Sequence, residues 1–154
     1  MKTRTSILAL LVAVAGLFPG FVSASNNVEK LVLGNHVMTL QWLQNYKGIG
    51  KAKIFRRDGV IHIDGYQQEK YKGSLNYMTI KGTLTILGPK ELEFNGDIKT
   101  KINYLNGGVP YQRSGKYLLK AWGSRKYWRM QNMTQPDGKY TVTDYIDIYF
   151  QKFR

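Results

Sequence analysis

The stretch ELEFNGDIKTKINY, residues 91–104, decides the fold class of this chain. Its apolar side chains alternate with polar ones, so that one face carries Leu92, Phe94, Ile98, Ile102 and Tyr104. The residues between them on the other face are acids, amides and lysines. A period of two is the signature of a β-strand that buries one face. We therefore predict a strand over Glu91–Tyr104 with its apolar face turned towards the core.

The same alternation recurs on both sides of this stretch. Leu75–Leu87 places four apolar residues on one face, with Gly82 among them as a predicted bend or bulge: Met78, Ile80, Leu84 and Ile86. Tyr140–Phe150 also has four apolar residues on its inward face: Val142, Ile146, Ile148 and Phe150. Asp144 is the one polar residue on that face. A buried carboxylate needs a partner, and Arg113 and Arg129 are the two candidates.

Turn residues separate the alternating stretches: Asp58-Gly59, Gly88-Pro89-Lys90, Asn106-Gly107-Gly108 and Pro136-Asp137-Gly138. They leave five further predicted strands: His36–Gln44, Gly50–Arg57, Val60–Gln68, Pro110–Ala121 and Lys126–Asn132. We predict an all-β domain in which one antiparallel meander of about eight strands closes into a small up-and-down barrel. A two-sheet sandwich is the alternative, and it needs longer crossovers. The state of Asn26–Leu33 stays open.

The N-terminus has the pattern of a secretory signal peptide. Lys2 and Arg4 precede an apolar run from Ile7 to Phe18, and Val22-Ser23-Ala24 offers a small-residue cleavage site. That run is too short to cross a bilayer as a helix. We expect residues 1–24 to be removed and residues 25–154 to form a single periplasmic or secreted domain.

Composition narrows the chemistry. The chain has 23 Lys and Arg against 10 Asp and Glu, a formal net charge of +13, and no cysteine. A chain without cysteine has no disulfides, thiolate metal sites or thiol nucleophiles. Its positive field attracts polyanions, which for an exported protein are lipid headgroups, lipopolysaccharide or other envelope polyanions. Export argues against cytoplasmic nucleic acid as a partner.

Catalytic and metal-binding patterns give no positive signal. His36 and His62 are the only histidines, and they lie on different predicted strands. Glu91 and Glu93 share the polar face of a strand, where solvated charge is the usual state. The sequence also has no nucleophile elbow, Walker loop or dinucleotide fingerprint. We predict a protein that is not an enzyme, with no cofactor and no metal.

The signal peptide, the early tryptophan of TLQW (residues 39–42) and the eight-strand meander resemble the lipocalin and calycin group. This resemblance implies a barrel that carries a small apolar ligand. Leu40 stands where lipocalins carry glycine, and the usual disulfides are missing. The stretches RKYWR (125–129) and TDYIDIYF (143–150) are similar to the C-terminal parts of uncharacterised exported bacterial proteins. That second similarity implies no activity.

Two functions follow as hypotheses. In the first, the barrel mouth holds a small apolar or amphiphilic ligand, and the lining includes Trp42, Met78, Phe94, Ile98, Tyr104 and Tyr117. In the second, a basic and aromatic face docks on anionic envelope components through Arg113, Lys116, Lys120, Arg125, Lys126 and Arg129. The predicted ligand contacts are Trp42, Phe94, Tyr104, Arg113, Tyr117, Trp128, Arg129 and Asp144.

Overall fold

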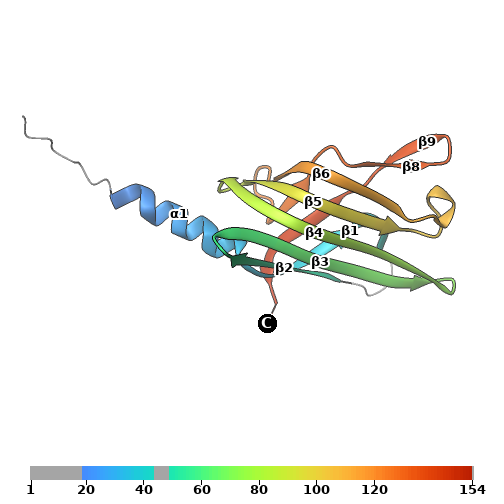
Figure 1. Cartoon of the computed structure of the whole chain (residues 1–154), viewed down its shortest axis with the longest axis horizontal. Helices are drawn as coiled ribbons and strands as arrows, with labels where there is room; N and C mark the ends of the chain where they lie inside the picture. The colour runs from blue at the N-terminus through green and yellow to red at the C-terminus, as the bar shows by residue number, and fades with distance from the viewer. Residues whose placement is uncertain (1–18, 44–48, 154) are drawn as a thin grey trace, which may run out of the picture.

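The structure is a computed structural model that describes residues 19–43 and 49–153. One helix, α1 (Pro19–Val32), leads away from one end of the sheet (Figure 1). The strands that follow are β1 (Gly34–Leu40), β2 (Gly50–Arg57), β3 (Val60–Tyr71), β4 (Ser74–Gly88), β5 (Glu91–Lys101), β6 (Tyr111–Lys120), β7 (Tyr127–Met130), β8 (Thr134–Asp137), β9 (Tyr140–Thr143) and β10 (Ile146–Lys152). Two short 3-10 helices, η1 (Gln41–Leu43) and η2 (Asn106–Gly108), follow β1 and β5.

Eight of these strands form one closed antiparallel barrel in the order β1-β10-β7-β6-β5-β4-β3-β2. β1 closes the barrel because it pairs with β10 on one side and with β2 on the other. From β1 to β7, consecutive strands are neighbours, so the chain follows the predicted up-and-down path. The prediction of an all-β, eight-stranded antiparallel barrel is confirmed.

The prediction of one strand over Tyr140–Phe150 is wrong. Its first part, β9, pairs with β8 in a separate two-stranded hairpin, and only β10 joins the barrel. The chain leaves the strand at Asp144, whose backbone N–H donates to the carbonyl oxygen of Met133 at 3.0 Å. This hairpin lies at the opposite end of the molecule from α1 (Figure 1). We call the end with α1 the helix end, and the end with η1, η2 and the β8–β9 hairpin the hairpin end.

The sequence left the secondary structure of Asn26–Leu33 open, and the structure shows that this segment is helical up to Val32. Val28, Leu31 and Val32 recur at helical spacing, and they pack against the barrel core, with Val32 fully buried. At the C-terminal end of the helix, the Lys152 ammonium donates to the carbonyl oxygens of Lys30 and Leu33. A cation at this position also stabilises the helix dipole. The last part of α1 is therefore anchored to the barrel.

His36 is a second link between helix and barrel. Its side chain is fully buried in β1, with Nδ1 2.8 Å from the carbonyl oxygen of Tyr149 on β10 and Nε2 2.7 Å from that of Val32 on α1. Burial lowers the pKa of His36 below its usual value, while the two carbonyl oxygens act in the opposite direction. The imidazole thus joins two elements that are far apart in the sequence.

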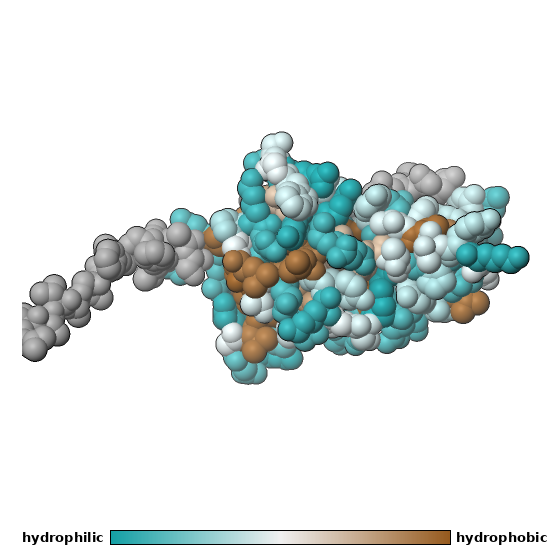
Figure 2. Space-filling view, turned by 90° about the horizontal axis from the view of Figure 1, so that it is seen from above, coloured by the Kyte–Doolittle hydropathy of each residue, from teal (hydrophilic) through white to brown (hydrophobic). Residues whose placement is uncertain are grey.

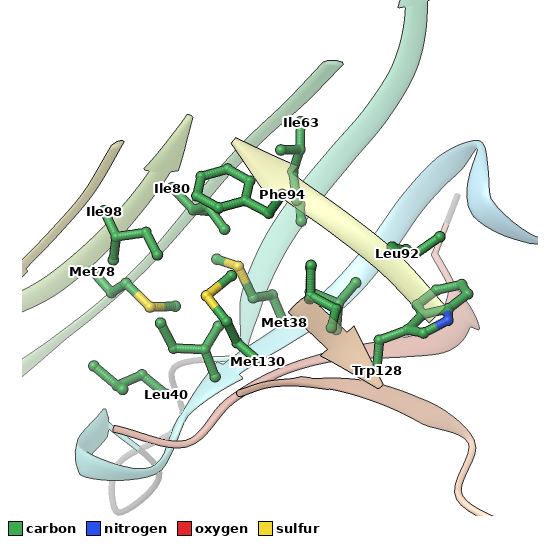
Figure 3. Packing of buried hydrophobic residues seen from close by; sticks show 14 of the residues in the cluster. Met38, Leu40, Ile63, Met78, Ile80, Leu92, Phe94, Ile98, Trp128 and Met130 are labelled. Carbon is green, nitrogen blue, oxygen red and sulfur yellow. The ribbon is translucent and has the colours of Figure 1, made fainter. Parts of the chain in front are cut away.

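Side chains fill the middle of the barrel (Figure 3). The inward residues predicted on the β5 stretch are almost completely buried: Leu92, Phe94, Ile98 and Ile102. They meet fully buried residues of other strands, including Met38, Ile80 and Trp128. A barrel of eight strands is just wide enough for its own side chains to fill it. The inward face predicted for these four residues is confirmed.

A row of glycines crosses three neighbouring strands. Gly82 on β4 lies opposite Gly96 on β5, which lies opposite Gly115 on β6. The Phe94 ring covers the first two, since a Cβ added there would lie 2.8 Å and 2.9 Å from its ring carbons. The strand register is continuous at Gly82, and the irregularity in β4 falls between Ile86 and Gly88 instead. The predicted bulge at Gly82 is therefore wrong. The glycine instead leaves room for the ring of Phe94.

Candidate functional sites at the two ends of the barrel

The residues predicted as ligand contacts lie in three separate places. Trp42, Tyr104, Arg113 and Asp144 gather at the hairpin end; Phe94, Tyr117 and Trp128 lie in or against the core; Arg129 faces outward on β7. The eight residues therefore do not form one cluster. Their role as ligand contacts stays a prediction.

At the hairpin end, Asp144 is the centre of a buried polar cluster. Its carboxylate has no exposed surface, and it accepts hydrogen bonds from the Arg113 guanidinium and, at 2.8 Å, from the indole N–H of Trp42. Arg113 also donates to the carbonyl oxygen of Thr134 on β8 at 2.8 Å. The prediction that Asp144 points inward and pairs with an arginine is confirmed, and the partner is Arg113.

Two predicted positions in this region are wrong. Arg113 is buried against Asp144, so it is not part of a basic docking face. Tyr104 is 45 % exposed and follows the end of β5 at Lys101, so it does not line the interior. Its hydroxyl donates to the carbonyl oxygen of Trp42 at 2.7 Å. Partial burial raises the pKa of Tyr104, as does the negative charge of Glu69.

Arg129 lies on the outer face of the barrel. It donates two hydrogen bonds of 2.7 Å to the carboxylate of Asp147, its register partner on β10. Its guanidinium also lies 4.4 Å from the ring centre of Tyr145 and 5.3 Å from that of Tyr127. The hydrogen bonds to Asp147 raise the pKa of Arg129, which keeps the guanidinium charged. This group stabilises the contact between β7 and β10.

The remaining predicted contacts belong to the core. Trp128 is fully buried, and its ring centre lies 4.3 Å from that of Phe150 and 6.0 Å from that of His36. Phe94 stacks on the half-buried Tyr117 at 6.4 Å. These aromatic pairs contribute packing energy. They lie between the two ends of the barrel and hold its shape.

An open, mainly apolar hollow of about 880 Å³ lies at the helix end. Its lining combines α1 with the β2–β3 and β4–β5 turns: Val28, Glu29, Arg56, Gly59, Val60, Ile61, Leu84, Thr85, Ile86, Leu87, Gly88 and Pro89. Glu29 of α1 and Arg56 of β2 bridge it with an ion pair of 2.9 Å. In Figure 2, hydrophobic residues gather near this end among hydrophilic ones. The hollow has mainly apolar walls and is bridged by one ion pair.

The sequence patterns missed this hollow. Val60 and Leu87 are 46 % and 54 % exposed, and each lies beside a predicted turn. An apolar side chain next to a turn was the one feature of the sequence that could have indicated the hollow. The other wall is α1, for which the strand pattern predicted no structure. The hollow exists only because a helix and two distant turns meet.

Across 19–43 and 49–153, no three His, Cys, Asp or Glu side chains come together in a way that could hold a metal ion. None of the helical residues that the structure describes forms a span long and apolar enough to cross a membrane.

Comparisons with known proteins agree on one family. The profile of the PM1083 family matches residues 21–150. A curated relative, the uncharacterized protein PM1083 of Pasteurella multocida (strain Pm70), is 33 % identical over 125 residues, which cover 81 % of this chain and 77 % of the relative. No solved structure gives a significant match. The match extends from α1 into β10 and so includes nearly all of the barrel: this chain belongs to the PM1083 family.

Proposed function

We propose that this protein is an exported, non-enzymatic binding protein that holds a small amphiphilic ligand in the helix-end mouth of its barrel. The observation that carries the proposal is the open apolar hollow between α1 and the β2–β3 and β4–β5 turns. Ligand pockets typically measure 300–1,000 Å³ and combine apolar walls with a few polar groups. At about 880 Å³, the hollow lies within that range.

The apolar walls suit an alkyl chain. Val28 on one side and Val60, Ile86 and Leu87 on the other offer aliphatic surface. Two of these side chains, Val60 and Leu87, are about half exposed. Burial of such surface by a ligand is favourable, at about 25 cal/mol per Å² of apolar area. The affinity of the ligand therefore comes mainly from its tail.

Charge favours an acidic head group. Arg56 is the cation in the lining, and its partner Glu29 is half-buried on α1. A carboxylate or phosphate head can take the place of Glu29 as a partner of the guanidinium. The net charge of +13 attracts such a ligand from a distance. The ligand class is therefore an amphiphile with one acidic head and an aliphatic tail.

Two aspartate variants on one strand test this function. Leu87 and Leu75 are exposed leucines of β4, 54 % and 42 %, at the helix end and the hairpin end respectively. In calorimetric titration with dodecanoate, Leu87→Asp is expected to weaken binding at least tenfold, and Leu75→Asp is expected to bind like the unmodified protein. Native mass spectrometry of protein purified from its own envelope should show a lipid-sized adduct that organic extraction removes. Absence of saturable dodecanoate binding, or an equal loss in both variants, would reject the proposal.

Docking on an anionic surface is a second candidate function, and the exposed aromatic and basic side chains of the β6–β7 turn favour it. Trp122 is 58 % exposed, and the Lys120 ammonium lies 5.5 Å from its ring centre. Arg125 and Lys126 are exposed on the same turn. Aromatic side chains sit at lipid interfaces and cations bind headgroup phosphates. Trp122→Ala should then reduce salt-sensitive binding to vesicles of phosphatidylglycerol, whereas Leu75→Ala should not.

A further inference from the structure

A layer of buried polar side chains closes the inside of the barrel at the hairpin end. Gln67 accepts a hydrogen bond from the backbone N–H of Leu40 at 2.6 Å, and Asn76 accepts one from that of Asn103 at 2.8 Å. The Thr100 hydroxyl lies 3.0 Å from the side-chain oxygen of Gln135 on β8. Except for Asn103, the residues that contribute side chains to these bonds are at most 3 % exposed. Leu40, which contributes its backbone N–H, is also buried. This layer lies outside the hollow proposed above as the ligand site.

Glu69 on β3 is the charged member of the layer, and its carboxylate lacks adequate partners. It is 5 % exposed, and one carboxylate oxygen accepts only a long hydrogen bond of 3.4 Å from the Asn76 side chain. Its other oxygen, Oε2, is buried and has no hydrogen-bond partner. Among the residues that the structure describes, no Lys, Arg or His forms an ion pair with Glu69.

The other buried acids of this protein show the contrast. Asp144 pairs with Arg113, and Asp147 pairs with Arg129. A buried carboxylate is costly unless a cation and hydrogen bonds compensate it. The chain has 23 Lys and Arg, more than twice the number of its acids, yet none of the described ones is placed at Glu69. The missing charge at this position is one that a ligand can supply.

The surroundings of Glu69 suit a small organic cation. Tyr104 lies close enough for the Glu69 charge to raise its pKa, and it forms an edge-to-face pair with Tyr71 at 5.7 Å. Aromatic rings next to a carboxylate are favourable neighbours for an ammonium group. The site is also near the surface, because β3 ends at Tyr71 and Tyr104 is 45 % exposed.

We propose that the unpartnered carboxylate of Glu69 binds the ammonium group of a small primary amine at the hairpin end of the barrel, beside Tyr71 and Tyr104. A metal ion fits less well, since no three His, Cys, Asp or Glu side chains come together among the described residues. The ammonium donates to Oε2 and supplies a positive charge that none of the described Lys, Arg or His side chains provides there. This site is separate from the helix-end hollow and does not depend on the function proposed for it.

The experiment uses n-butylammonium chloride as the probe and Glu69→Gln as the test variant. Asp64→Asn is the matched control, because it removes the same charge from an exposed position on the same strand. At ten times its Kd, the amine is expected to raise the Tm of the unmodified protein and of Asp64→Asn by about 4 °C. The same concentration of sodium chloride should not do so. Glu69→Gln should lose the response and, without the amine, melt no lower than the unmodified protein, because it has lost an uncompensated charge.

Nuclear magnetic resonance of the unmodified protein gives an answer that does not need a variant to fold. The side-chain amide signals of Asn76 and Gln135 should move saturably with n-butylammonium and stay in place with sodium chloride. Saturation by calcium chloride without a response to the amine would overturn the assignment to an ammonium group. A lack of any saturable response would mean that only water meets Oε2, and it would overturn the proposal. A Glu69→Gln protein that keeps the amine response would do the same.

Discussion

The carboxylate of Asp144 lies fully buried against the guanidinium of Arg113, although the two residues are 31 positions apart. This pair joins β6 to the chain between β9 and β10. It lies where β6 is no longer paired with β7, since those strands share only the register pairs Leu119–Met130 and Lys120–Arg129. The buried pair therefore ties the hairpin end together where the backbone ladder does not.

Asp144→Asn should strongly destabilise the fold. The amide can still accept from the Trp42 indole, but it leaves the charge of Arg113 buried without an anionic partner. The free energy of unfolding is expected to fall by about 3–5 kcal/mol, measured by urea denaturation. Glu93→Gln, which breaks the exposed pair with Lys116 on the outside of the barrel, is the control and should cost less than about 1 kcal/mol. Equal losses in the two variants would contradict the structural role of Asp144.

Arg129→Lys should loosen β7. Lysine keeps the charge but cannot make the two parallel hydrogen bonds to Asp147. Because the arginine side chain is 25 % exposed, we expect a loss of about 1 kcal/mol. Hydrogen exchange should become faster at Tyr127–Met130 and stay unchanged in β4. Arg125→Lys, on the exposed turn before β7, should leave exchange as it is; a similar acceleration there would contradict the role of the bidentate pair.

Gly82→Ala and Gly88→Ala should differ although both lie on β4. A Cβ at Gly82 would lie 2.3 Å from the carbonyl oxygen of Asn95 and 2.8 Å from the Phe94 ring, whereas one at Gly88 meets nothing within 4 Å. We expect Gly82→Ala to cost about 3 kcal/mol or more through overpacking. Gly88→Ala should change stability by less than about 0.5 kcal/mol. Thermal melting measures both, and a tolerated alanine at Gly82 would show that the Phe94 ring is not held over the glycine.

The stability of the protein should depend on pH through His36. Its folded-state pKa lies below the usual 6.5, so the unfolded chain binds a proton more readily than the folded one. The free energy of unfolding is therefore expected to fall as the pH is lowered from about 7.5 through 6.5 towards the folded-state pKa. His36→Gln should remove this dependence between pH 5.5 and 7.5. His62→Gln, a half-buried position where the ring stacks on Phe55, should keep it; an equally flat profile would assign the dependence elsewhere.

The strand pattern could be read from the sequence because alternation reports burial directly. Leu92, Phe94 and Ile98 are all in the core, as their spacing predicts. A period of two needs no knowledge of which strand lies alongside. The same parity predicted that Asp144 points inward. It could not choose between Arg113 and Arg129, because that choice depends on which strands become neighbours.

The limits of the sequence patterns are clearest at strand ends. The predicted strand beginning at Val60 stopped at Gln68, but β3 continues to Tyr71 and carries Glu69 into the barrel. Buried and exposed residues continue to alternate at the end of β3, but the buried ones there are polar. A prediction based on apolar side chains does not detect such residues. The Tyr140–Phe150 stretch failed in the opposite way, because one continuous alternation hides a change of sheet at Asp144.

The sequence by itself determined the antiparallel strands, their buried faces and the need for a partner at Asp144, since each of these follows from residue type and spacing along one segment. The tertiary structure decided which arginine pairs with Asp144 and that α1 forms one wall of the helix-end hollow. It also decided that none of the described cations forms an ion pair with Glu69. These features depend on distances between segments that are remote in the chain. Such distances are fixed only when the barrel closes and brings its two ends together.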